Sequence, residues 1–220
     1  MATLEDFLPD VQPYCPGVPI PTAERAVLHA LREFCTISAY WREDQTFTTV
    51  TGASGTGEYT VTLAAGSDMA SLLIPITHKN NPVYLKNEVW LTENHAKDWR
   101  TRTGEQAKYF TMSAPTIVRL VPYPTIAVVG DLRITKILWP TLTSPLIDDI
   151  VLDYAEEISK GASARLMMMP GQQWTDERGL RAASLMLAFK EGCDDAKSKA
   201  IAKWQDRSHQ RTRRTRGHFF

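Results

Sequence analysis

Five arginines near the end of the chain carry the clearest chemical signal in the sequence. They lie within residues 207–216, and residues 207–220 contain no acidic side chain. Guanidinium groups bind phosphate oxygens, so this segment could bind nucleic acid. They could equally dock into an acidic groove of a protein partner and become ordered on contact. The candidate contact residues are Arg207, Arg211, Arg213, Arg214, Arg216, His218, Phe219 and Phe220.

The two closing phenylalanines favour a protein partner. Aromatic side chains anchor protein interfaces, and no aromatic residue is interleaved among the arginines to stack on bases. Nucleic-acid binding stays open as the alternative, and a solvated tail without a binding role is the third possibility. With too few apolar residues to fold alone, residues 207–220 are predicted to form a flexible tail in the free protein.

Motifs for catalysis or metal binding are missing from the sequence. It contains no His-Glu-x-x-His, no Cys-x-x-Cys and no Gly-x-Ser-x-Gly, and the glycine run at 52–57 lacks the Gly-Lys-Ser/Thr of a phosphate-binding loop. His78 and His95 stand 17 residues apart, with no carboxylate at ligand spacing. We therefore predict no catalytic residue, no metal site and no cofactor.

A cluster of carboxylates could in principle do acid–base chemistry. The same residues suit the solvated N-terminal part of a helix, where acids stabilise the helix dipole. We predict that the protein is not an enzyme, and an activity such as cell-wall hydrolysis stays only a competing hypothesis. The cluster consists of Asp148, Asp149, Asp153, Glu156 and Glu157.

Composition bounds the class of protein. The 220 residues suit one domain, or a domain with a large insertion. No apolar run reaches the ~18 residues of a membrane span, and the first residues do not resemble a secretory signal. Residues 1–206 hold 20 basic and 25 acidic side chains, a net charge of −5, so the basic tail follows a mildly acidic body. Three widely spaced cysteines predict a reducing compartment and buried thiols: Cys15, Cys35 and Cys193.

The element that must position these groups is a predicted helical hairpin. One helix is expected over about 145–169 and the next from Thr175 past residue 192, because apolar residues recur at steps of three and four. The turn between them holds Pro170, Gly171, Trp174 and Asp176, with Thr175 as the expected N-cap. Trp174 and Asp176 could form a contact surface, or they could close the hairpin while Asp176 caps the next helix.

A third helix is expected over 21–41, and the pattern between the helices changes to the period of two that is typical of strands. The predicted domains are a helical base of residues 1–43 and 141–206, a β module of residues 44–140 inserted into it, and the tail 207–220. The predicted fold class is α+β: an antiparallel bundle of three to four helices with an inserted antiparallel β module and an extended C-terminal tail.

The assembled pattern resembles the head-to-tail adaptor (connector) proteins of tailed bacteriophages. The resemblance spans nearly the whole chain, from Val11-x-Pro-Tyr-Cys-Pro16 through Arg119-Leu-Val-Pro-Tyr-Pro124, and is strongest in Met169-Pro-Gly-Gln-Gln-Trp-Thr-Asp176. The proline that usually precedes this tryptophan in the family is Gln173 here. Each motif is a packing motif of low specificity; their order and spacing carry the resemblance.

This resemblance implies an assembly role. Family members form a ring, typically of twelve copies, beneath the portal protein at the capsid vertex. The ring extends the channel for genomic DNA, which passes without sequence-specific binding, and presents a docking platform for a tail or nozzle protein. It implies a virion protein of the head–tail junction, assembled in the host cytoplasm without a membrane partner. The family's C-terminal segment reaches the portal, and the corresponding residues here are 207–220.

Overall fold

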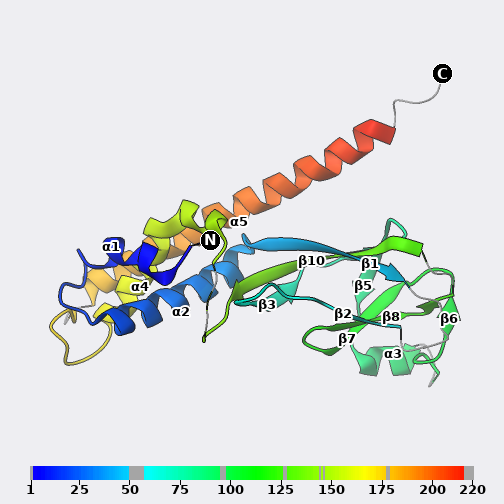
Figure 1. Cartoon of the computed structure of the whole chain (residues 1–220), viewed down its shortest axis with the longest axis horizontal. Helices are drawn as coiled ribbons and strands as arrows, with labels where there is room; N and C mark the ends of the chain where they lie inside the picture. The colour runs from blue at the N-terminus through cyan, green and yellow to red at the C-terminus, as the bar shows by residue number, and fades with distance from the viewer. Residues whose placement is uncertain are drawn as a thin grey trace. The chain divides into compact units, whose positions relative to one another are not determined.

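The chain divides into two compact units in the computed structural model. The helical unit comprises Met1–Trp41, Ala65–Asp68 and Leu138–Phe220, and the sheet unit comprises Arg42–Ala64 and Met69–Ile137. The structure describes residues 2–49, 57–94, 98–125, 128–143, 145, 147–176 and 179–215; in the last range, side chains are described through Ala202. Figure 1 shows the elements in chain order.

The helical unit contains the short helices η1 (Leu4–Phe7) and α1 (Leu8–Val11), followed by α2 (Ile20–Ser38). After the sheet unit the chain returns as η2 (Asp149–Tyr154), α4 (Ala155–Met167) and α5 (Leu180–Thr215). α4 packs against both α2 and α5, and α1 packs on α4. The apolar stripes expected from the sequence are buried here, including Val27, Leu31, Phe34, Ile158, Ala162, Leu166, Phe189 and Cys193.

Two glycines allow α4 and α5 to approach closely. A Cβ atom added at Gly161 would lie 2.6 Å from Cδ2 of Phe189, and one at Gly192 would lie 2.5 Å from Cγ of Glu157. Real carbon atoms in contact stay about 3.5–4.0 Å apart. The small residues of the hairpin, which in the sequence already predict that a neighbouring backbone can come close, therefore lie at the contact of α4 with α5.

The sheet unit is built on an eight-stranded mixed sheet. Its strand order is β1-β10-β4-β5-β7-β8-β2, with β3 also paired to β10. The described pairs are antiparallel except β5 and β7, which are parallel. The strands are β1 (Arg42–Thr49), β2 (Glu58–Thr60), β3 (Ser67–Leu72), β4 (Ile76–His78), β5 (Asn81–Leu85), β7 (Tyr109–Ala114), β8 (Ile117–Val121) and β10 (Val128–Pro140).

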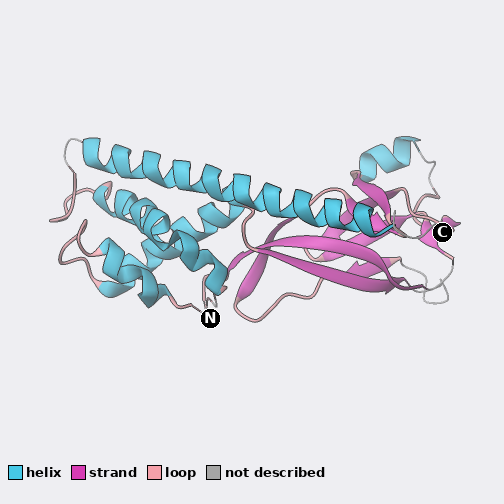
Figure 2. Cartoon of the chain, turned by 90° about the horizontal axis from the view of Figure 1, so that it is seen from above, coloured by secondary structure: helices cyan, strands magenta, loops and turns pink. Residues whose placement is uncertain are grey.

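Two smaller elements complete this unit. Helix α3 (Glu88–Asn94) follows β5, and the two-residue strands β6 (Thr103–Gly104) and β9 (Tyr123–Pro124) pair in parallel. Alternate residues of the strands point into one core, as the period of two requires. That core includes Tyr59, Ile76, Val83, Phe110, Val118, Leu120, Leu132 and Ile134. Figure 2 separates the strands from the helices by colour.

The predicted fold class is wrong. The strands form a large mixed sheet with a core of its own, rather than an antiparallel module inserted into a helical bundle. The adaptor resemblance also implied a helical bundle with a β module inserted between helices, and the same finding corrects that expectation. β5 and β7 can pair in parallel because the connection between them, which includes α3, is long enough to return the chain to the edge of the sheet where β5 begins.

Local predictions also need correction. Residues 145–169 do not form one helix, since η2 has 3-10 geometry and precedes α4. The short apolar run from Val89 to Leu91, which the sequence pattern assigns to a strand, belongs instead to helix α3. Residues 207–215, expected to lack regular structure, continue the helix α5. The remaining tail residues, Arg216, His218, Phe219 and Phe220 among them, lie outside the described residues.

Candidate interaction surfaces

The predicted arginine cluster lies on the far part of α5. This helix runs for 36 residues, and the last buried side chain in its described part is Ala200. Residues 207, 211, 213 and 214 follow on the same helical backbone. Positions 207, 211 and 214 recur at steps of four and three, which places these positions on one face of a helix. The helical backbone therefore continues past this last buried residue into the arginine-rich segment.

The turn of the helical hairpin works as a structural cap. Oδ2 of Asp176 accepts hydrogen bonds from the backbone N–H groups of Arg181 (2.7 Å) and Ala182 (3.1 Å), at the start of α5. The capping role expected for Asp176 is confirmed. Thr175 is not the N-cap: its hydroxyl donates to the carbonyl of Met169 (2.5 Å) and accepts from the N–H of Gln172 (3.1 Å).

The other turn residues also have local structural roles. Pro170 and Gly171 are exposed, and Gly171 has φ +74°, which favours glycine. The indole N–H of Trp174 is buried and has no partner within the described residues. The structure therefore places all four predicted turn residues at one end of the hairpin, where Asp176 holds the helix start.

A surface that sequence reasoning missed lies on the sheet unit, beside α3. It is a pocket of about 460 Å³ with mainly apolar and aromatic walls. The Trp90 and Tyr109 rings pack edge to face with centroids 5.1 Å apart, and Nζ of Lys86 lies 4.5 Å from the Trp90 ring centroid. Ile74 and Tyr84 are about half exposed. The six lining residues are Ile74, Tyr84, Leu85, Lys86, Trp90 and Tyr109.

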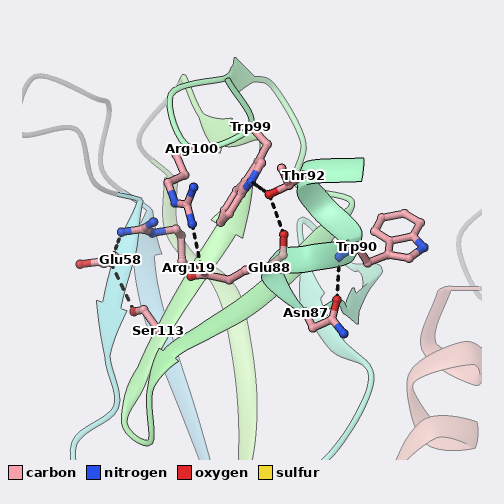
Figure 3. A network of polar contacts seen from close by, with 9 residues as sticks. All are labelled: Glu58, Asn87, Glu88, Trp90, Thr92, Trp99, Arg100, Ser113 and Arg119. Carbon is pink, nitrogen blue, oxygen red and sulfur yellow. Dashed lines mark hydrogen bonds and ion pairs between the residues drawn. The ribbon is translucent and has the colours of Figure 1, made fainter. Parts of the chain in front are cut away.

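Polar contacts hold α3 so that Trp90 faces this pocket (Figure 3). Oδ1 of Asn87 accepts from the backbone N–H of Trp90 (2.7 Å), which caps the helix start. Arg100 pairs with Glu88 (2.6 Å), and the Trp99 indole N–H donates to Thr92 (3.1 Å). In Figure 3 the Trp90 side chain points away from these contacts.

A second ion pair, between Arg119 and Glu58, joins β8 to β2 in the same unit. The hydroxyl of Ser113 donates to the same Glu58 carboxylate (3.3 Å). These groups fix the rim of the sheet and do not converge on a reactive centre. The sequence signal from which this pocket could have been anticipated was a tyrosine and a tryptophan only six positions apart, at 84 and 90.

The titratable groups singled out from the sequence serve packing and capping. His78 is buried; the Ala107 N–H donates to its Nδ1 (3.0 Å), so Nε2 carries the proton and donates to Asp131 (3.2 Å). Burial lowers the pKa of His78, although Asp131 opposes the shift. His95 lies outside the described residues. Within the described ranges there is no group of three metal-ligating side chains.

Three carboxylates of the predicted acidic cluster make local structural contacts in the part of the chain that the structure describes. Asp148 accepts from the N–H of Ile150 (3.1 Å) at the start of η2, and Asp153 accepts from the Tyr40 hydroxyl (3.3 Å). Glu156 pairs with Lys160 one helical turn later (2.7 Å). These contacts agree with the expectation of a helix N-terminal region rather than an acid–base pair.

The three cysteines are free and buried. Burial raises the pKa of the Cys15 thiol to about 11 and those of Cys35 and Cys193 to about 12. Such thiols are protonated at neutral pH and unreactive. The expectation that they act as small buried hydrophobic residues is confirmed.

No protein-family model matches the chain, and no curated protein matches it. Of the helices in the described residues, none combines the length and the apolar character needed to cross a bilayer. Functional inference therefore depends on the surfaces of this chain itself.

Proposed function

We propose that this protein is a head-to-tail adaptor of a tailed bacteriophage, a structural subunit that forms a ring beneath the portal protein. One observation carries the proposal: the helical backbone of α5 continues past Ala200, the last buried side chain in its described part, into the arginine-rich segment. A helix that presents cationic side chains beyond its last buried residue suits docking into an acidic groove of a partner. The resemblance of the sequence to adaptor proteins supports the same role.

The far part of α5 and residues 216–220 are proposed to bind the portal. Five cationic side chains suit an acidic groove, and two terminal phenylalanines suit apolar pockets within it. In a ring, proposed here to have twelve copies, many such contacts act together, so weak single contacts add up to a durable joint. The net charge of −5 on residues 1–206 would disfavour adhesion of DNA passing through the lumen.

The sheet unit is proposed to face the tail. Its pocket beside α3 presents Trp90 and Tyr109, and aromatic residues are enriched at the centres of protein interfaces. The docking platform for a tail or nozzle protein would then lie on a different unit from the portal-binding helix.

The proposal is tested by mixing the purified protein with the portal protein of the same phage. Assembly on the portal is followed by sedimentation, for the full chain and for a form that ends at Asp206. We expect the full chain to join the portal and the shortened form to lose that joining. Docking of the shortened form at unchanged affinity would refute the portal-binding role of residues 207–220.

A substituted protein separates charge from helix length. All five arginines of residues 207–216 are replaced by glutamine, which preserves helix propensity. The matched control replaces Arg25 and Arg133, which are exposed and lie outside α5, by glutamine. Loss of portal binding only in the five-arginine variant supports the proposal.

Nucleic-acid binding through the same arginines is the alternative function. Its test is a salt titration of binding to duplex DNA by the full chain. Affinity that falls steeply with salt and vanishes in the glutamine variant would favour it, because phosphate contacts release counterions. Portal joining without DNA binding at low salt would exclude it.

A further inference from the structure

The chain segment between β6 and β7, residues 105–107, is held to the β4–β5 hairpin by two hydrogen bonds. Nζ of Lys79 donates to the Glu105 carbonyl (2.7 Å), and the Ala107 N–H donates to Nδ1 of His78 (3.0 Å). Within this segment only Ala107 buries its side chain, and the other two residues are exposed. Because the segment buries little apolar surface, it can open without unfolding the sheet.

His78 can hold this segment only while its ring is neutral. A backbone N–H is always a donor, so Nδ1 must carry a lone pair to accept from Ala107, and Nε2 donates to Asp131 (3.2 Å). A second proton would have to bind at Nδ1. The new ring N–H would then face the Ala107 N–H, and this hydrogen bond would be lost. The His78 ring is fully buried, so water cannot replace the lost partner while the segment stays closed.

Charged groups on the elements around the ring act in opposite directions. Asp131 of β10 favours the protonated ring, and Lys79 of the hairpin disfavours it. Glu105, on the segment itself, has an exposed side chain. Burial outweighs Asp131, so the pKa of His78 in the closed form is lowered. Once the segment opens and water reaches the ring, the ring binds a proton more readily, so acid favours the open form.

We infer that His78 is an acid-sensitive latch: at neutral pH its ring holds residues 105–107 closed, and protonation of the ring releases them. The release is limited to this segment, because the next residue already belongs to the sheet: the Lys108 N–H donates to the Val121 carbonyl (3.0 Å). On the other side of the segment, β6 pairs with β9. All of these groups belong to the sheet unit, so the latch would work whether or not the protein is an adaptor.

Amide hydrogen exchange on the full chain, followed residue by residue by NMR, tests the latch. Exchange is measured at about pH 7.5 and about pH 5, on either side of the ordinary histidine pKa of about 6.5, and each rate is corrected for the intrinsic effect of pH. The Lys108 amide, which is the next along the chain and is bonded within the sheet, is the internal reference. Low concentrations of urea identify the mode of opening, because urea accelerates exchange through global unfolding but not through small local openings.

We expect the Ala107 amide to lose several-fold of its protection at the lower pH. The upper limit is about thirtyfold, for a proton that binds only to the open form with the ordinary histidine pKa of about 6.5. At the lower pH, Ala107 should exchange at least about tenfold faster than Lys108 and should not respond to low urea. The latch is overturned by equal protection of the two amides at the lower pH, by protection of Ala107 that does not change with pH, or by equal acceleration of both amides in urea.

Two glutamine variants separate His78 from the other histidines. His78→Gln keeps a side-chain oxygen that can accept from the Ala107 N–H but cannot titrate, so the pH dependence of exchange at Ala107 should disappear. The matched control is His29→Gln, because His29 is exposed on α2 in the helical unit, and it should leave this pH dependence unchanged. Persistence of the pH dependence in His78→Gln, or its loss in His29→Gln, would overturn the latch. The wild-type comparison of Ala107 with Lys108 decides the question even if His78→Gln does not fold.

Discussion

Replacing Gly161 by alanine tests the reasoning about the helical unit most directly. The new Cβ atom would lie 2.6 and 2.7 Å from Cδ2 and Cγ of Phe189, a ring that is itself fully buried. Neither the rigid ring nor the α4 backbone can move without disturbing the packing of α4 on α5. The substitution therefore over-packs the centre of the helical unit.

Two effects of known size oppose each other. Overpacking a well-filled core costs about 1–3 kcal/mol. Alanine in place of glycine inside a helix contributes about 1 kcal/mol of stability. Since the predicted overlap with Phe189 is nearly 1 Å relative to ordinary carbon contacts of about 3.5 Å, we expect the clash to win. The free energy of unfolding should fall by up to about 2 kcal/mol.

Urea unfolding followed by far-ultraviolet circular dichroism measures this change, with Ser184→Ala on the exposed side of α5 as the control for helix propensity. The control should gain about 0.5 kcal/mol at most. The double variant Gly161→Ala with Phe189→Leu should lose less free energy of unfolding than the sum of the two single variants, by roughly 1–2 kcal/mol. The reason is that the smaller leucine leaves room for the new Cβ atom. A Gly161→Ala protein about 1 kcal/mol more stable than the wild type would refute the close approach of α4 and α5.

Three further outcomes are expected. Because burial lowers the pKa of His78, the imidazole binds a proton more readily in the unfolded chain than in the folded protein. The free energy of unfolding should therefore fall as the pH drops below about 6.5. Denaturation at several pH values should show a weaker dependence of this free energy on pH in His78→Gln than in the wild type. Asp176→Ala should lower the free energy of unfolding by about 0.5–2 kcal/mol, because it removes the oxygen that accepts hydrogen bonds from two helix N–H groups. Asp176→Asn keeps such an oxygen and should lower the free energy by less. Equal losses in the two variants would contradict the capping role. A thiol reagent at neutral pH should label none of Cys15, Cys35 and Cys193 until the protein is denatured. Rapid labelling of the native protein would contradict the burial of these cysteines.

Helix positions and buried helix faces could be predicted from the sequence because both follow from local rules. The recurrence of apolar residues in α2, α4 and α5 identified side chains that are buried, such as Leu31, Ile158 and Phe189. The turn after Met169 was found because Pro170 stops a helix and Gly171 adopts a positive φ. The capping role of Asp176 could also be anticipated because the contact is local: the two backbone N–H groups that donate to it are only five and six residues further along the chain.

The sheet could not be predicted beyond the presence of strands. Pairing β10 with β1, β3 and β4 joins residues far apart in the sequence, and the period of two says nothing about which strands become neighbours. Val89–Leu91 looked like a strand because a short apolar run fits either structure. Its helical form depends on Asn87, which caps α3 after β5 ends.

The sequence by itself determined which faces of the helices are apolar and where the cationic residues gather, because those properties belong to the chain locally. Only the tertiary structure decided which apolar residues stay outside. Leu180 and Leu187 on α5 have the same residue type as the buried Leu185, and they are exposed because α4 and α2 cover the other side of the helix. The aromatic pocket at Trp90 exists for a similar reason: the parallel pairing of β5 with β7 brings Tyr84 and Tyr109 into register, side by side in the sheet.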